Sequence, residues 1–278
     1  MGIRLHSRAG SGIAGIRARW ASVFAVIGGI AIFAFPPFAA AATSTSSASA
    51  STTATANATP SKTSKPQSSR PDVILSNETT SSTWSVADYA DPIRAQPRNS
   101  SARIASLQFL TPDGFLQSYL LLREHWTGSQ LWIKLRIPGR PNGRVGWVPR
   151  GDLDAFHHTN MQVVVNRTAE RLTLYRAGRA IFEAPVGVGK PSTPTPPGDF
   201  WITEAFASSD PFYGPYAFGT SDYSTLSEWP GGGIVGLHGT NEPSLVPGDP
   251  SHGCIRLHNS DILRLSSLLS IGTPLLVE

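Results

Sequence analysis

The sequence predicts a mostly β protein in which an export segment and a linker precede two folded domains, with one or two short helices. Apolar and polar residues alternate over short segments bounded by Gly, Pro, Asn and Ser, which is typical of strands joined by turns. Helical spacing after a capping residue occurs near the end of the chain. Hydrophobic residues make up 40% of the 278 residues and aromatic residues 9%, which is enough for packed cores.

Residues 1–42 are interpreted as an export signal. Arg4, Arg8, Arg17 and Arg19 precede an uncharged run at 20–35, which is followed by two prolines and four alanines. A positive start, an apolar run and small residues at a cleavage site define a signal peptide. An uncleaved signal anchor stays open, because the run approaches the lower length limit for spanning a bilayer. In both cases the remainder of the chain is expected to be exported.

Residues 43–83 are predicted to form a disordered linker. Up to about residue 71 this segment consists mainly of Ser, Thr, Ala, Pro and Lys, without an aromatic or acidic residue. Such a composition cannot bury enough apolar surface to fold. We expect a flexible spacer that holds the folded domains away from the export site.

The basic character of the chain comes from its N-terminus. The formal net charge is +4, but removal of residues 1–42 leaves 19 basic and 19 acidic groups. From Asp72 onward there are 16 basic and 19 acidic residues. The predicted folded part is therefore slightly acidic, without a basic stripe, which argues against nucleic-acid binding.

Residues 84–153 are predicted to form a small β-barrel. Alternating segments lie at 102–107, 131–136 and 146–148, with a Pro-Gly-Arg-Pro-Asn-Gly turn at 138–143. This pattern resembles a bacterial SH3-like domain of the sort found beside envelope enzymes. Trp132 and Trp147 are expected in its core, because large aromatic residues are usually buried. Binding of wall polymer by these rings is the alternative.

Residues 160–278 are predicted to form a second β domain. Segments 161–165 and 171–175 form a hairpin that 180–188 continues. The segment 206–229 is expected to be a long loop acting as a lid, carrying Tyr213, Tyr216 and Tyr223. A helix capped by Asn259 or Ser260 is expected to extend to residue 269, before a last strand at 272–277.

Cys254 is the single cysteine of the chain. Structural cysteines of exported proteins come in pairs, so an unpaired one is a candidate nucleophile. If residues 251–257 are extended, Cys254 shares a face with His252 and Arg256, while Ile255 and Leu257 point to the core. Gly253 has no side chain to keep a substrate carbonyl from the main-chain N–H groups, as an oxyanion site requires.

A second imidazole lies sixteen residues upstream. Residues 234–240 are interpreted as a short apolar strand that delivers His238 at its end, where strand pairing would bring it to the cysteine. A thiol of ordinary pKa needs an adjacent base or cation to act as a nucleophile. The local geometry allows either His238 or His252 to be that base.

His238 followed by Ser251-His252-Gly253-Cys254 resembles the signature of the L,D-transpeptidase (YkuD-type) catalytic domain. The segment 193–202 is also similar to the Thr-Pro-x-Gly-x-Phe pattern of that family. The resemblance implies a β-sandwich in which Cys254 is the nucleophile. It further implies that His238 transfers protons, oriented by a main-chain carbonyl near Thr240, while His252 has an orienting or charge-stabilising part.

The resemblance also implies an activity in the bacterial cell envelope. Cys254 would attack a peptidoglycan tetrapeptide stem at its third residue, a diamino acid, releasing D-alanine and forming a thioester. The amine of a neighbouring stem would then give a 3→3 cross-link, without cofactor or metal. The remaining predicted site residues orient the motif, hold the oxyanion or bind substrate: Ser251, Thr240, Gly253, Arg256 and Tyr223. Carbapenems, which acylate the cysteine, inhibit family members.

Three alternatives stay open. If water replaces the amine, the same site is an L,D-carboxypeptidase. Zinc held by His238, His252, Cys254 and His258 uses permissible ligands but lacks the usual spacing of zinc motifs. A non-catalytic protein that binds wall polymer is the third, and the intact Cys/His set argues against it.

Overall fold

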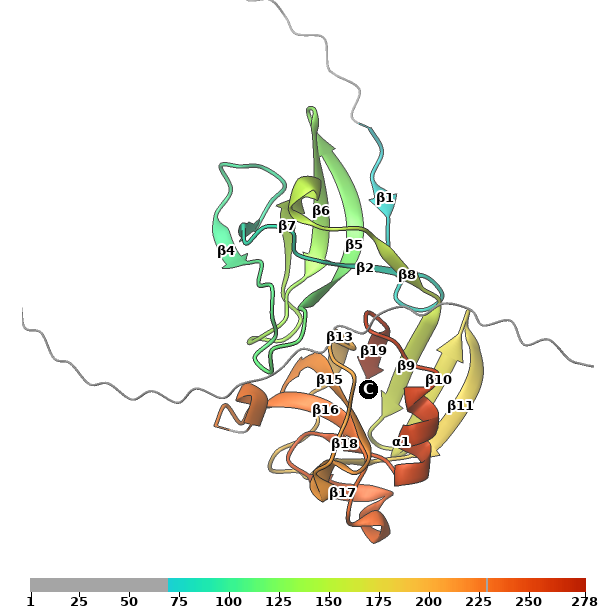
Figure 1. The fold of residues 1–278 in the computed structure, drawn as a ribbon. Helices are drawn as coiled ribbons and strands as arrows, with labels where there is room; N and C mark the ends of the chain where they lie inside the picture. Colours follow the sequence, from blue (N-terminus) through green and yellow to red (C-terminus); the bar gives the residue numbers. More distant parts are fainter. Residues whose placement is uncertain (1–69, 229) are drawn as a thin grey trace, which may run out of the picture. The chain divides into compact units, whose positions relative to one another are not determined.

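The computed structural model describes residues 70–228 and 230–278 (Figure 1). The predicted export signal and most of the predicted linker lie outside the described residues. Among the residues that are described, none belongs to a helix long and apolar enough to cross a membrane.

The first part of the described chain forms an eight-stranded sheet in the order β4-β3-β7-β6-β5-β2-β8, with β1 paired to β5. Its strands are β1 (Val73–Ile74), β2 (Ser82–Val86), β3 (Pro92–Arg94), β4 (Arg103–Ser106), β5 (Ser118–Thr127), β6 (Gln130–Arg136), β7 (Val145–Pro149) and β8 (His157–Thr159). The three predicted strand segments correspond to β4, β6 and β7, with the predicted turn between the last two. The resemblance to an SH3-like barrel stays a prediction.

The structured region begins earlier than the sequence predicted. β1 and the start of β2 fall within residues 43–83, the predicted linker. The apolar run Val73-Ile74-Leu75 pairs with β5 or packs against the core. Asn77 then turns the chain, since its Oδ1 accepts hydrogen bonds from the N–H groups of Thr79, Thr80 and Ser81. Pairing with the distant strand β5 gives this segment a defined structure that its local composition did not indicate.

The two tryptophans of this sheet differ in burial. Trp132 is 1% exposed and is one of the largest fully buried side chains. Trp147 is half-buried, and its ring contacts the edge of His125 at 5.7 Å between centroids. The prediction that both rings lie in the core is confirmed for Trp132 and only in part for Trp147.

The second part of the chain contains two further sheets. One has the order β11-β10-β9-β19-β13 and the other β14-β15-β16-β18-β12-β17. The first contains β9 (Met161–Asn166), β10 (Arg171–Arg176), β11 (Arg179–Pro185), β13 (Gly198–Trp201) and β19 (Pro274–Val277). The second contains β12 (Gly187–Gly189), β14 (Phe206–Ala207), β15 (Tyr216–Tyr223), β16 (Ile234–His238), β17 (Gly248–Ser251) and β18 (Ile255–Arg256). The predicted hairpin and the last strand are confirmed.

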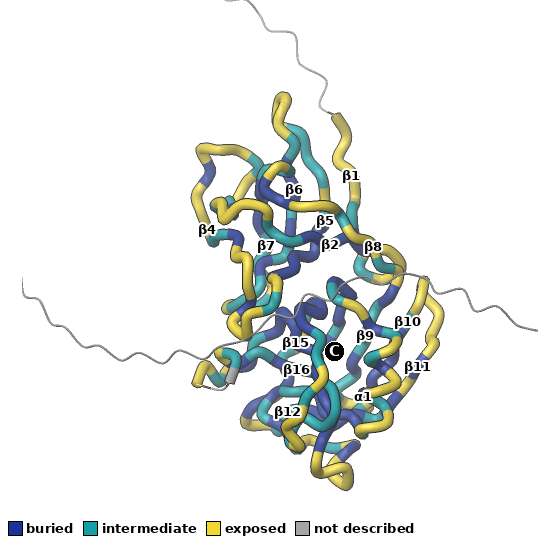
Figure 2. Tube along the Cα trace, viewed as in Figure 1, coloured by how far each residue is buried: buried dark blue, intermediate teal, exposed yellow. Residues whose placement is uncertain are grey.

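One hydrophobic cluster joins both sheets and the helix α1 (Asn259–Ser266), and its members form the dark interior of this region (Figure 2). Val163, Leu172 and Leu275 enter it from the five-stranded sheet, and Leu237 and Ile255 from the six-stranded one. The predominantly β fold predicted from the alternating pattern is therefore confirmed.

The predicted cap of α1 is wrong. The residue before the helix is His258, and its side chain makes no capping hydrogen bond. The Asn259 amide oxygen instead accepts a hydrogen bond from the N–H of Thr240 at 2.9 Å. The helix is fastened through its buried residues Ile262 and Leu265, and Asn259 ties its start to the end of β16.

The prediction of one long loop at 206–229 is also wrong for residues 206–207 and 216–223, which form strands. Residues 216–223 form β15, a buried strand that pairs with β14 and β16 inside the sheet. Gly219, Thr220, Ser221 and Asp222 have the composition of a loop but are buried. Gly219 is required here because the carboxylate of Glu204 occupies the space beside it, 2.6 Å from where a Cβ would be.

Candidate active site

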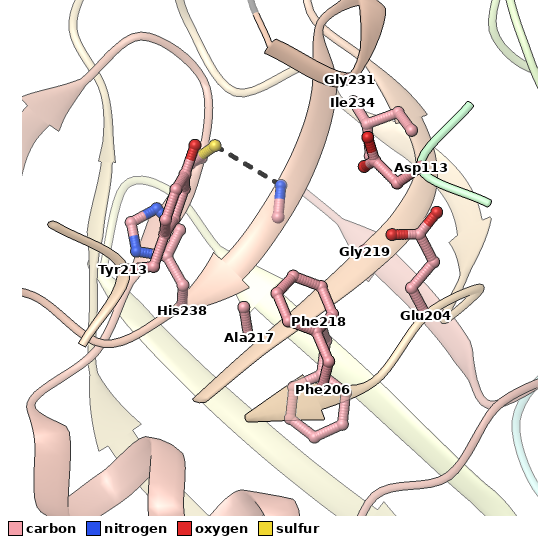
Figure 3. A pocket seen from close by; sticks show the side chains of 12 residues that line it. Asp113, Glu204, Phe206, Tyr213, Ala217, Phe218, Gly219, Gly231, Ile234 and His238 are labelled. Atoms are coloured by element: carbon pink, nitrogen blue, oxygen red, sulfur yellow. Dashed lines mark hydrogen bonds between the residues drawn. The ribbon is translucent and has the colours of Figure 1, made fainter. Parts of the chain in front are cut away.

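The cysteine lies where two parallel strands meet. β16 pairs with β18 in the register Leu237 to Ile255 and His238 to Arg256. The N–H of Gly236 donates a hydrogen bond to the sulfur of Cys254 at 3.5 Å, which is the dashed line in Figure 3. Ile255 and Leu257 are fully buried, as predicted. The strand pairing expected from the sequence thus brings the end of β16 to the thiol.

Cys254 and His238 open into the same cavity of about 250 Å³. Its walls carry Tyr213, Ala217, Phe218 and Ile234, and its far side carries Glu204 and Asp113 (Figure 3). A second, smaller cleft also contains both Cys254 and His238, together with His252 and Arg256. The sulfur is therefore not sealed in hydrocarbon.

His238 is held as a neutral imidazole. The residue is 1% exposed, and its Nδ1 lies 2.6 Å from the carbonyl oxygen of Gly239, to which it donates. Burial lowers the pKa of His238 to about 4, against the opposing effect of the Gly239 carbonyl, and Arg256 lowers it further. Within the described structure, Nε2 has no hydrogen-bond partner. Nε2 therefore presents a lone pair next to the cavity at neutral pH.

The thiol is neutral as well. Burial raises the pKa of Cys254, while the Gly236 N–H and Arg256 oppose that effect and the carboxyl group of Asp222 adds to it. A neutral thiol and a neutral imidazole define a site in which the proton moves during attack, in place of a preformed thiolate–imidazolium pair.

His252 is engaged elsewhere. Its Nε2 lies 2.8 Å from Nζ of Lys190, and its carbonyl oxygen accepts a hydrogen bond from Ser224 Oγ at 3.2 Å. The lysine ammonium is a donor, so it occupies the ring nitrogen that would otherwise act as the base. The structure thus distinguishes two histidines between which sequence geometry could not choose.

The expected role of Gly253 needs correction. Its N–H donates to Ser251 Oγ at 3.1 Å, and that hydroxyl donates to the carbonyl oxygen of Cys254 at 2.6 Å. The N–H of Gly253 is therefore engaged within the motif, and the neighbouring N–H of Cys254 is the remaining main-chain candidate for an oxyanion donor. Gly253 has φ of 129°, and a Cβ there would face Ser224 and Val235, so backbone conformation and packing require the glycine.

The remaining predicted residues take different places. The carbonyl that orients His238 belongs to Gly239, one residue before Thr240. Arg256 is buried, donates to Glu242 Oε2 at 2.9 Å and lies over the Phe212 ring, next to the thiol.

Tyr223 is not among the residues that line these two cavities, and it lies under the guanidinium of Arg140 at 5.0 Å. Tyr213 occupies the cavity wall instead, edge-on to His238 at 5.0 Å.

Sequence reasoning missed the acidic side of the cavity. Glu204 follows β13, and Asp113 belongs to a turn between β4 and β5. A further carboxyl group, that of Asp222 on β15, is not among the residues that line this cavity. The buried Asp222 accepts a hydrogen bond from Asn142 at 2.8 Å, and burial raises its pKa to about 8. No spacing in the sequence connects these carboxyl groups to Cys254, because they belong to segments that are far apart along the chain.

The described side chains do not support a zinc centre. Among residues 70–228 and 230–278, no three His, Cys, Asp or Glu side chains are grouped so that they could hold a metal ion. The fold and the site define a mostly β protein with an unpaired cysteine and a neutral imidazole at one cavity.

Comparison with known proteins identifies the family. The sequence model of the L,D-transpeptidase catalytic domain (YkuD) matches residues 160–277. A candidate L,D-transpeptidase YkuD of Bacillus licheniformis is 34% identical over 112 residues, covering 40% of this chain and 62% of the relative. A candidate L,D-transpeptidase YqjB of Bacillus subtilis is 30% identical over 124 residues, covering 41% and 69%. The chain belongs to the L,D-transpeptidase (YkuD) family.

Solved structures of L,D-transpeptidases are also similar. An enzyme from Mycobacterium tuberculosis is 14% identical with a TM-score of 0.38, covering 69% of this chain and 98% of that one. The catalytic domain from Enterococcus faecium is 22% identical with a TM-score of 0.33, covering 42% and 96%. Because these TM-scores are low, family membership rests on the sequence matches. The chain spans 62% and 65% of the first two curated relatives.

Proposed function

We propose that this protein is an exported peptidoglycan L,D-transpeptidase that forms 3→3 cross-links in the cell envelope through a thioester on Cys254. The observation that carries the proposal is the pairing of β16 with β18. It brings the thiol to one cavity with a neutral histidine whose Nε2 has no hydrogen-bond partner among the described residues. Membership of the family supports the choice of stem peptides as substrate.

The chemistry starts from neutral groups. Cys254 Sγ forms a bond to the carbonyl carbon of the third stem residue as its proton passes to His238 Nε2. The N–H of Cys254 is proposed to stabilise the negative oxygen of the tetrahedral intermediate. The carbon–nitrogen bond to D-alanine then breaks, and the leaving amine takes the proton from His238. The thioester that results holds the acyl group on the enzyme.

In the second half of the reaction the proton transfers run in the opposite direction. The uncharged side-chain amine of a neighbouring stem attacks the thioester carbon, and His238 accepts a proton from that amine. The carbon–sulfur bond breaks, and the sulfur recovers its proton from His238. If water attacks instead, the product is a tripeptide stem and the enzyme acts as an L,D-carboxypeptidase. The acidic and apolar walls of the cavity are common to both outcomes.

Intact-mass spectrometry after mixing with a carbapenem tests the nucleophile. We expect one covalent adduct on the wild type and none on Cys254→Ala. An unmodified wild type that melts cooperatively would contradict the proposal. Analysis of products from stem tetrapeptides, with and without an acceptor amine, then separates cross-linking from hydrolysis.

Sacculus binding tests the non-catalytic alternative. A protein that only binds wall polymer would sediment with sacculi as wild type and as Cys254→Ala, without releasing D-alanine in either form. D-alanine release by the wild type alone would exclude that function.

A further inference from the structure

The cavity of Cys254 has two chemically different ends. Cys254, His238 and Tyr213 form one end, and Glu204 and Asp113 form the other. Ala217, Phe218 and Phe206 lie between them (Figure 3). A group bound along this cavity would therefore meet a nucleophile, then an apolar wall, then negative charge.

Glu204 is the central feature of the acidic end. The residue is 2% exposed, and its Oε1 has no hydrogen-bond partner within the described structure although the residue borders the cavity. A buried carboxyl oxygen without a partner costs free energy unless a ligand supplies one. Burial and the charge of Asp113 raise the pKa of Glu204, whereas a hydrogen bond from Thr111 lowers it. A cation in the cavity would offset both unfavourable effects.

Asp113 is fixed at this position by packing. Its turn is closed by hydrogen bonds from Thr111 N to Phe115 O and from Gly114 N to Thr111 O. Phe115 stacks on Phe206 of β14, with centroids 5.4 Å apart, and Phe206 itself lines the cavity. The carboxylate lies against the main chain of Gly231, where an added Cβ would be 3.1 Å from Oδ2. In Figure 3 the side chains of Asp113 and Glu204 lie near each other at this end.

Neither carboxylate is neutralised by the surrounding protein. Across the described residues, no Lys, Arg or His forms an ion pair with Glu204 or Asp113. Arg140 packs on Tyr223 nearby, but its guanidinium donates to the carbonyl oxygens of Ser224, Gly232 and Leu226. The negative end of the cavity is therefore available to an external cation.

The donor of the proposed reaction carries a diamino acid at its third residue, and we propose that Glu204, with Asp113 beside it, recognises that residue by binding the primary ammonium at the end of its aliphatic side chain. This inference rests on the proposed function. The apolar wall suits the methylene groups of such a side chain. The acceptor amine is a poorer occupant, because it must be uncharged and close to the thioester to react.

Two tetrapeptide donors that differ only at the third residue test the inference. One carries L-lysine there and the other norleucine, which keeps the methylene chain but lacks the ammonium. The readout is kcat/KM for D-alanine release. The wild type should prefer the lysine donor by about 10- to 100-fold, as expected for a charge-assisted contact in a buried site.

Glu204→Gln should reduce that preference to about one, and Asp113→Asn should reduce it in part. Glu183→Gln, an exposed carboxylate on β11 paired with Arg171, serves as the matched control and should keep the wild-type preference. Thermal unfolding establishes that each variant is folded. Asp113 is on an exposed turn, so its variant tests the inference even if Glu204→Gln does not fold.

A wild type that cleaves both donors equally, or a folded Glu204→Gln that keeps the preference, would overturn the subsite and leave the proposed function standing. Failure of both donors and of carbapenems to acylate the folded wild type would overturn both proposals.

Discussion

The main-chain N–H of Gly236 points at the sulfur of Cys254 across the parallel pairing of β16 with β18, at 3.5 Å. This contact favours the thiolate, but burial of the sulfur is the larger effect and raises the pKa of Cys254. The strand pair therefore positions the thiol without ionising it in advance. In the proposed mechanism the thiol proton passes to His238, whose Nε2 is unpartnered within the described structure.

The first prediction concerns the protonation state of the resting thiol. The rate constant for alkylation of Cys254 by iodoacetamide should rise about tenfold per pH unit between about pH 6 and 8, because the thiolate is the reactive form. Labelling followed by intact-mass spectrometry measures it, with Cys254→Ala as the blank. A rate constant that no longer changes with pH below about pH 7 would mean that Cys254 and His238 form a thiolate–imidazolium pair, and would contradict the neutral resting thiol.

The second prediction separates the two histidines. His238→Gln should slow acylation by a carbapenem by about 100-fold or more, because a general base contributes that much. His252→Gln should slow it by less than about tenfold, because Lys190 already occupies its Nε2. Stopped-flow acylation of both variants, each checked for cooperative melting, gives the comparison. The opposite order would transfer the role of base to His252.

The approach of Cys254 to the strand that ends in His238 could be predicted from the sequence, because the signals are local. Cys254 has no partner cysteine in the chain, and His238 ends a short apolar strand. The alternation that buries Ile255 and Leu257 also follows from the sequence. The break between β17 and β18 at Gly253 was not predictable. The φ of Gly253 is 129°, and the Ser251 hydroxyl forms hydrogen bonds to both the N–H of Gly253 and the carbonyl oxygen of Cys254.

The acidic side of the cavity and the strand β15 were both missed by the sequence-based prediction, and for the same reason. β15 consists largely of small polar residues that locally indicate a loop, and its strand conformation comes from pairing with β14 and β16. Glu204 and Asp113 come from distant parts of the chain and meet at the cavity only in the folded protein. Long-range packing and strand pairing place them there, and a single sequence carries no periodic signal for either.

The third prediction concerns Arg140, which lies in the turn between β6 and β7. Its guanidinium donates to Ser224 O and Gly232 O, next to the Gly231 and Ile234 walls of the cavity. Arg140→Ala leaves these carbonyl groups without their donors, so the free energy of unfolding should fall by about 1 to 3 kcal/mol. Acylation by a carbapenem should slow as well.

Urea unfolding measures the loss of stability at Arg140. Arg171→Ala is the matched control, because its side chain is 53% exposed and its contact with Glu183 is long at 3.4 Å. Such a surface pair contributes about 0 to 1 kcal/mol. Equal losses for the two variants would show that Arg140 does not hold the cavity wall.

The fourth prediction uses the buried carboxyl group of Asp222, whose pKa burial raises to about 8 from an ordinary 3.8. Between these two pKa values the folded protein keeps a proton that the unfolded chain releases, so this group lowers stability as pH rises. Its cost reaches about 4 kcal/mol at pH 7. Asp222→Asn removes that cost and keeps an oxygen acceptor for Asn142.

The difference in free energy of unfolding between Asp222→Asn and the wild type should therefore grow from near zero at about pH 4 and level off above about pH 8. The buried His238 has the opposite sign. Its pKa falls from 6.5 to about 4, so its contribution to stability is lost as pH falls through that window. Because both proteins contain His238, its effect cancels in the difference. Urea unfolding at pH intervals measures the curve, and a difference independent of pH would show that Asp222 is ionised in the folded protein at all these pH values.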